Sequence, residues 1–126
     1  MPVYQTSGSI TALYPGDSAI VVNNEQPASG TASRQVAIAQ NPGGEAVKLS
    51  VEATFAAAPG AFEIDLQTSD TDSDADYVSE TSSTLTAVNA NFTARAEFPN
   101  LVALFARVIT KTANANAVNS TVKITR

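Results

Sequence analysis

Apolar and polar residues alternate in steps of two along several short stretches, and this periodicity limits the possible folds more than any other feature of the chain. The clearest stretch is residues 47 to 55, VKLSVEATF, in which five apolar residues are separated by four polar ones. Successive side chains of a β-strand point to opposite faces, so the pattern predicts a strand with one buried and one solvated face. Strands of this kind are typical of antiparallel sheets.

Similar or shorter stretches predict the other strands. They cover residues 9–13, 19–22, 35–39, 62–67, 84–88, 92–96, 102–110 and 118–125. The stretch 102–110 is the most continuously apolar, so we expect it to be the central strand. Turn-forming sequences separate the stretches, among them Pro59-Gly60, Pro99-Asn100 and Asn114 to Asn116.

These short strands at regular spacing predict an all-β fold, a single antiparallel β-sandwich or jelly roll of about eight strands. A length of 126 residues fits one domain. We expect this domain to occupy residues 10–126. Residues 1–9 are polar enough to form an extended N-terminal arm.

The chain contains no Cys, His or Trp, and these absences exclude much chemistry. Without His there is no side chain whose ordinary pKa lies near 7, and without Cys there is no thiolate nucleophile, disulfide or zinc knuckle. We therefore expect no enzymatic activity and no cofactor. No apolar run is long enough for a membrane helix, and the N-terminal residues do not resemble a secretory signal, so we expect a soluble, non-secreted protein without a membrane partner.

Charge is distributed unevenly along the sequence. Residues 61–80 carry seven of the twelve acids and no base, whereas residues 95–126 carry five of the seven bases and one acid. This asymmetry predicts a bipolar molecule that contacts neighbours of complementary charge. The formal net charge of −5 argues against nucleic-acid binding. We expect Arg95 and Arg107 to pair with acids of this chain or of a partner.

The run Asp70, Asp72, Asp74, Asp76 places a carboxylate at every second residue. In an extended strand these four negative charges would line one face, and their mutual repulsion must be relieved. A calcium ion is one possible means, since an EF-hand loop begins with acids at alternate positions. However, Ala75 and Thr81 stand where that loop requires Gly and Glu, so the EF-hand interpretation fails. A solvated acidic loop is the favoured interpretation. Tyr77, which follows the run, is a candidate platform for a sugar ring, although a structural role in a strand is the simpler interpretation.

The stretch from Pro59 to Thr68, with the acidic run to Tyr77 and the segments FTARAEFP and LFARV that follow, resembles small virion proteins of tailed bacteriophages. Among these, the sequence is most similar to capsid decoration, or cement, proteins. The resemblance covers residues 46 to 126 best. It implies a β-rich and often trimeric protein that bridges neighbouring major capsid proteins, and it carries over no active-site residue.

We therefore predict a structural protein on the exterior of a bacteriophage capsid, assembled in the host cytoplasm, with the major capsid protein and its own copies in a homotrimer as partners. A carbohydrate-binding module of a phage tail or fibre, or another tail or connector component, is the alternative. The candidate partner-binding residues are Val3, Tyr4, Asp70, Asp72, Asp74, Asp76 and Tyr77.

Overall fold

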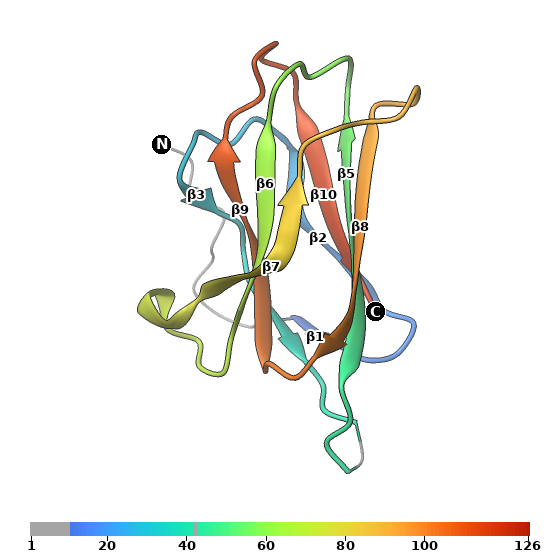
Figure 1. Cartoon of the computed structure of the whole chain (residues 1–126), viewed down its shortest axis with the longest axis vertical. Coiled ribbons are helices and arrows are strands. Elements are labelled where there is room, and N and C mark those ends of the chain that lie inside the picture. The colour runs from blue at the N-terminus through green and yellow to red at the C-terminus, as the bar shows by residue number, and fades with distance from the viewer. Residues whose placement is uncertain (1–10, 42) are drawn as a thin grey trace.

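Two β-sheets that face each other make up the part of the chain that the computed structural model describes, residues 11–41 and 43–126 (Figure 1). The predicted all-β, two-sheet architecture is confirmed. Within these ranges, helical structure is limited to one 3-10 turn, η1 (Asp74–Asp76). The predicted arm, residues 1–9 with Val3 and Tyr4, lies outside the described residues.

The first sheet has the strand order β1-β4-β9-β6-β7, and β3 also pairs with β9. Its strands are β1 (Thr11–Leu13), β3 (Thr31–Ala32), β4 (Val36–Ile38), β6 (Glu63–Ser69), β7 (Val78–Leu85) and β9 (Phe105–Thr112). Strand β9 contacts β3, β4 and β6, which confirms that the most apolar stretch of the sequence is central. The pairing of β1 with β4 is parallel, contrary to the prediction of a wholly antiparallel fold.

The second sheet has the order β2-β10-β5-β8 and is antiparallel throughout. Its strands are β2 (Ser18–Glu25), β5 (Val47–Phe55), β8 (Thr93–Leu101) and β10 (Ser120–Thr125). The bounds of β5 are those that the alternation of the sequence predicts. Every second residue of β5 is buried, because only one face of this sheet packs against the other sheet.

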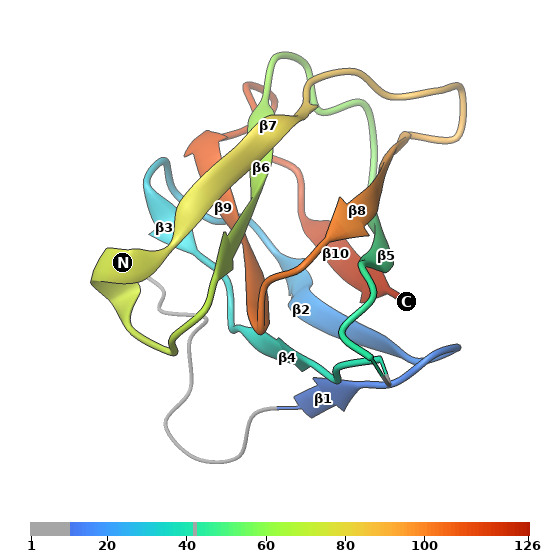
Figure 2. The same cartoon turned by 60° about the horizontal axis from the view of Figure 1, so that its bottom comes forward.

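The antiparallel pairs are nested in the sequence. Strands β6 and β7 form a hairpin in the middle of the chain, β5 pairs with β8 around it, β4 with β9 around these, and β2 with β10 outermost. Apart from the β6–β7 hairpin, each step from one of these eight strands to the next changes sheet. Consequently, the edge strands β7 and β8 belong to different sheets and lie next to each other on one open side of the sandwich (Figure 2).

The core lies between the inner faces of the two sheets. Leu49 and Val51 of β5, Leu66 of β6 and Ile124 of β10 are fully buried. At one end of the sandwich the rings of Phe55 and Phe62 pack together with centroids 4.7 Å apart. Burial of these aliphatic and aromatic side chains is the main driving force for folding.

Two predicted boundaries on this open side are wrong. The strand expected at residues 84–88 is β7, which begins at Val78, and its polar sequence shows no alternation because it is an edge strand with an irregular register. The turn expected at Pro99-Asn100 lies inside β8. Pro99 is tolerated there for two reasons. Strand β8 is an edge strand, and its register against β5 shifts between the partners Leu49↔Phe98 and Val47↔Leu101. The missing N–H of Pro99 therefore interrupts no regular ladder of hydrogen bonds.

Candidate functional site

The acidic run forms a loop between β6 and β7 that is anchored to the first sheet by a single cation. Arg107 lies on the central strand β9 directly opposite Gln67 of β6. Its side chain is only 7% exposed, yet its Nη1 forms an ion pair with Asp74, whose side chain is 76% exposed. Its Nε donates to Oε1 of Gln67 at 2.9 Å. Arg107 therefore pairs with an acid of its own chain, as predicted, and ties the loop to the sheet.

Other polar contacts relieve the repulsion among the remaining carboxylates of the loop. The amide of Gln35 donates to Oδ1 of Asp72 at 2.9 Å, and the hydroxyl of Thr71 donates to Oδ2 of Asp76 at 2.5 Å. Asp70 is exposed. Within residues 11–41 and 43–126 no group of three or more acidic side chains is arranged to hold a metal ion. Hydrogen bonds and one ion pair thus relieve part of the repulsion among these carboxylates.

Tyr77 ends the loop and is buried rather than displayed. Its residue is 7% exposed, and the guanidinium of Arg107 lies over its ring, 4.0 Å from the centroid. This cation–π contact covers one face of the ring, and because the residue as a whole is buried, the ring offers no accessible face to a sugar. The interpretation of Tyr77 as a sugar platform is therefore wrong and the simpler structural interpretation is right, because the side chain packs under an arginine thirty residues further along the chain.

Burial raises the pKa of the Tyr77 phenol to about 12, and the nearby carboxylate of Asp72 adds to this effect by favouring the neutral form. Arg107 acts in the opposite direction. Although Asp72 is close enough to influence the phenol, the geometry between them falls short of a hydrogen bond, and the hydroxyl has no hydrogen-bond partner among the described residues. The phenol is thus a neutral, buried group at physiological pH.

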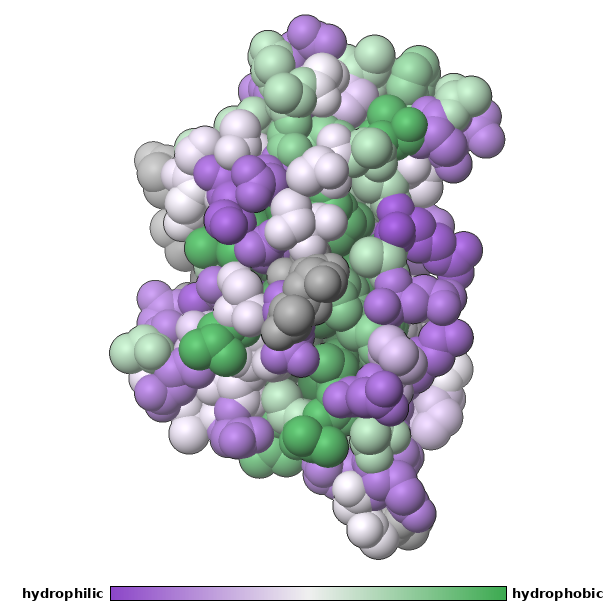
Figure 3. Space-filling view, viewed as in Figure 1, coloured by the Kyte–Doolittle hydropathy of each residue, from purple (hydrophilic) through white to green (hydrophobic). Residues whose placement is uncertain are grey.

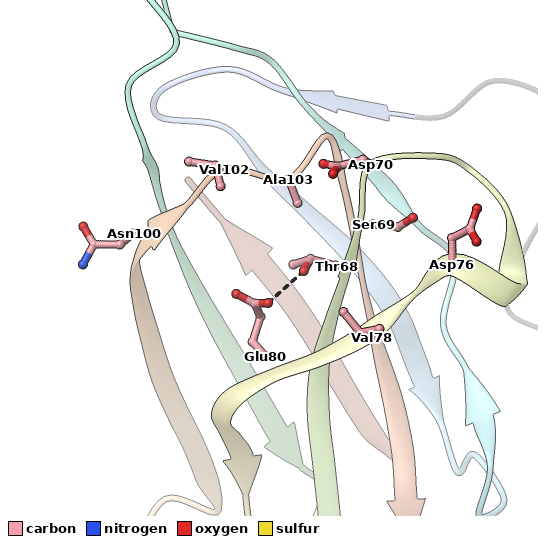
Figure 4. Close-up of a pocket in the computed structure, with 9 residues that line it drawn as sticks. All are labelled: Thr68, Ser69, Asp70, Asp76, Val78, Glu80, Asn100, Val102 and Ala103. Carbon is pink, nitrogen blue, oxygen red and sulfur yellow. Dashed lines mark hydrogen bonds between the residues drawn. The ribbon is translucent and has the colours of Figure 1, made fainter.

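Beside the loop, a hollow of about 270 Å³ opens between the edge strands β7 and β8 (Figure 4). Asp70, Asp76 and Glu80 contribute carboxylates to its lining, and Val78 and Val102 contribute apolar surface. Figure 4 shows Glu80 directed toward Thr68 of β6, whose hydroxyl donates to Oε2 of Glu80 at 2.9 Å. Two of the predicted acids, Asp70 and Asp76, therefore share one surface, while Asp72 and Asp74 are engaged with Gln35 and Arg107.

The apolar part of this surface was not predicted. Val78 is 62% exposed and Val102 is 69% exposed, and Leu104 is also exposed. Apolar side chains likewise reach the surface among polar ones in the lower half of the face in Figure 3. A signal was present in the sequence, because Leu101 and Val102 are adjacent apolar residues and cannot both point into the core from one strand. Leu101 is buried, so Val102 is not.

The predicted bipolar charge distribution is wrong, since the acidic and basic segments lie side by side. Lys111 of β9 lies 3.5 Å from Asp65 and 3.7 Å from Glu63 of the neighbouring strand β6. Lys48 pairs with Glu97, and Lys123 with Glu52. Most bases are therefore neutralised by acids of the same chain.

None of the helical structure in the described ranges is long and apolar enough to cross a membrane. Comparisons with protein-family models, curated proteins and solved structures gave no match to this chain.

Proposed function

We propose that this protein is a structural component of a bacteriophage virion that attaches to the outside of the capsid and bridges neighbouring major capsid proteins. The sequence resemblance described above suggests this role. The observation that carries the binding part of the proposal is the surface between β7 and β8, where exposed Val78 and Val102 adjoin carboxylates. An apolar patch with a polar surround is typical of a surface that contacts another protein.

The nesting of the strand pairs also supports the proposal. Eight strands in the orders β2-β10-β5-β8 and β4-β9-β6-β7, with the central hairpin β6–β7, follow the path of two Greek keys. We infer that the domain is a jelly roll, an architecture that viral capsid proteins share with some lectins. Because fold alone does not fix function, the lectin alternative is weighed on its site, and the covered ring of Tyr77 gives it no platform.

The mechanism needs binding energy alone. A protein that contacts two capsid subunits at once binds the assembled shell better than separate subunits, so it stabilises the shell by mass action. Trimerisation, which we also propose, raises the effective concentration of the second and third binding surfaces after the first has bound. Strong attachment of the trimer then does not require high affinity at each single contact.

Co-sedimentation tests the proposal. The purified protein is mixed with expanded empty shells assembled from the major capsid protein encoded in the same genome, and in parallel with unassembled subunits of that protein. We expect saturable binding to shells and none to subunits. Equal binding to both, or to neither, would refute the proposed function.

The N-terminal segment is tested in the same assay. We propose that residues 1–9, with Val3 and Tyr4 as their large apolar groups, act as an arm that orders on the partner. Deletion of residues 2–8 is expected to abolish shell binding and to leave the thermal unfolding temperature of the isolated protein nearly unchanged. A truncated protein that still saturates shells would exclude the arm.

A further inference from the structure

The hollow between β7 and β8 continues into a second one. The second hollow, of about 240 Å³, is lined by residues of the same two strands and shares Glu80 and Asn100 with the first. Together they form a groove along the seam where the edge of one sheet meets the edge of the other. We call this surface the β7–β8 groove and define it by Val78, Glu80, Pro99, Asn100 and Val102.

The groove is flanked by backbone edges that lack a sheet partner. Strand β7 pairs only with β6, and β8 pairs only with β5, among the strands that the structure describes. An edge strand presents unpaired N–H and C=O groups to an incoming chain, and addition of an extended segment is a common form of peptide recognition. The shape and the backbone therefore favour an extended occupant over a helix.

The charge around the groove sets the chemistry of this occupant. All twelve acids of the sequence lie in described residues, and seven of them make no ion pair with another described residue. Four of these seven, Asp70, Asp72, Asp76 and Glu80, fall between residues 70 and 80, and all of them except Asp72 line the first hollow. A cationic side chain would find uncompensated carboxylates here next to exposed valines.

This chain has few cations of its own to offer. Of its seven bases, Lys48, Arg107, Lys111 and Lys123 form ion pairs within the chain. Arg126 donates to the carbonyls of Leu13 and Ala39 and to the side chain of Asn41. Among the described residues, only the side chains of Arg34 and Arg95 form neither an ion pair nor a hydrogen bond with another residue. A second copy is thus a poorer source of cations than a different protein.

We propose that the β7–β8 groove binds an extended segment of a partner protein in which a Lys or Arg is flanked by apolar residues. The apolar residues cover Val78 and Val102, the aliphatic stem of the cation lies along them, and its charged end meets the carboxylates of Asp70, Asp76 and Glu80. This inference rests on the proposed function, within which the segment belongs to the major capsid protein.

Variants of the groove test the inference in the shell-binding assay. Val102→Ser removes apolar contact without changing the charge of the groove, and the double variant Asp70→Asn with Glu80→Gln removes charge at constant shape. We expect about a tenfold loss of shell affinity for the first and about a fivefold loss for the second at low salt. Affinity of the wild type should also fall as NaCl rises from about 50 to about 500 mM.

Matched controls lie on β2, which is the edge strand at the other end of the second sheet. Ile20→Ser changes another exposed aliphatic residue, and Glu25→Gln removes an acid with an exposed side chain. Both should bind shells as the wild type does. If the wild type binds shells and the groove variants bind equally well, the inference is wrong while the proposed function stands.

A peptide titration decides the inference even if the wild type fails to bind shells, a result that would refute the proposed function. The probe is an acetylated, amidated pentapeptide of sequence Leu-Arg-Leu-Arg-Leu, and its counterpart has Glu in place of Arg. We expect amide shifts at Val78, Glu80 and Val102 in heteronuclear NMR with the arginine peptide only, and weaker shifts at Val78 and Glu80 in Val102→Ser. Equal shifts with both peptides, or none at millimolar peptide, would overturn the proposal.

Discussion

Loss of the Asp74 charge should destabilise the protein more than loss of the buried Arg107 with which it pairs. In Asp74→Asn the guanidinium stays buried, with 7% of its side chain exposed, but loses its counter-charge. Removing one partner of a fully buried pair costs about 3–5 kcal/mol, and of an exposed pair about 1 kcal/mol or less. Since Asp74 itself is 76% exposed, water replaces it in part, and we expect an intermediate cost of about 2 kcal/mol.

Arg107→Met has the opposite balance. It loses the cation–π contact with Tyr77 and the hydrogen bond to Gln67, but it also removes the cost of burying a charge, which is several kcal/mol per ion. We expect its global stability to lie within about 1 kcal/mol of the wild type. The loop that Arg107 anchors should nevertheless open more often, and amide hydrogen exchange at residues 70–77 should become faster.

Thermal unfolding followed by circular dichroism measures these effects. For 126 residues the unfolding entropy is about 0.26 kcal/mol/K, so a cost of 2 kcal/mol lowers Tm by about 8 °C. Asp70→Asn makes the same charge change at an exposed residue and serves as the control, with an expected shift under about 2 °C. In the Arg107→Met background Asp74→Asn should also cost little, because the buried charge is gone. The reasoning is refuted if Asp74→Asn matches its control, or if its cost persists in that background.

Two further predictions concern Tyr77 and the turn at Gly60. Tyr77→Phe should leave Tm unchanged or raise it, because the buried hydroxyl has no partner to lose. Since the pKa of this phenol is about 12 when folded and about 10 when unfolded, the wild type should lose stability as pH rises from 10 to 12, and Tyr77→Phe should lose less over that range in a Tm series. Gly60→Ala should cost about 1–2 kcal/mol in urea denaturation, because φ is +70° and a Cβ would lie 3.2 Å from atoms of Ala115 and Asn116. The control Gly16→Ala also has a positive φ, +92°, but a Cβ there would lie in open space, so it should cost less. Equal costs would mean that backbone strain alone determines the loss of stability.

The strands that sequence periodicity predicted best are those with one face in the core. Strands β5 and β10 each alternate strictly, because every second side chain must leave water. Strand β7 was misplaced by six residues at its start, since an edge strand with polar residues on both faces and an irregular register carries no period. The polar sequence SETSST within it gives no reason to expect a strand.

The candidate site, too, was predicted only where the sequence carries a local pattern. A run of carboxylates is visible in the sequence, so Asp70 and Asp76 were found. The packing of Tyr77 against Arg107 was not, because Arg107 reaches the loop only after β9 has paired with β6. Long-range contacts of this kind leave no local pattern, and the exposed Val102 becomes visible only as an interruption of alternation after Leu101.

Charge shows most clearly how topology changes the meaning of a sequence pattern. Acids gather in the segment of β6 and bases in that of β9, which suggested two oppositely charged halves. Because these strands are antiparallel neighbours, the asymmetry becomes cross-strand pairing, as between Lys111 and Asp65. Within the acidic segment 61–80, the acids that form no such pair lie beyond the end of β6 or on the edge strand β7, as Asp70 and Glu80 do. The uncompensated charge is therefore concentrated beside the apolar groove, where it favours local recognition of a cation over steering by the whole molecule.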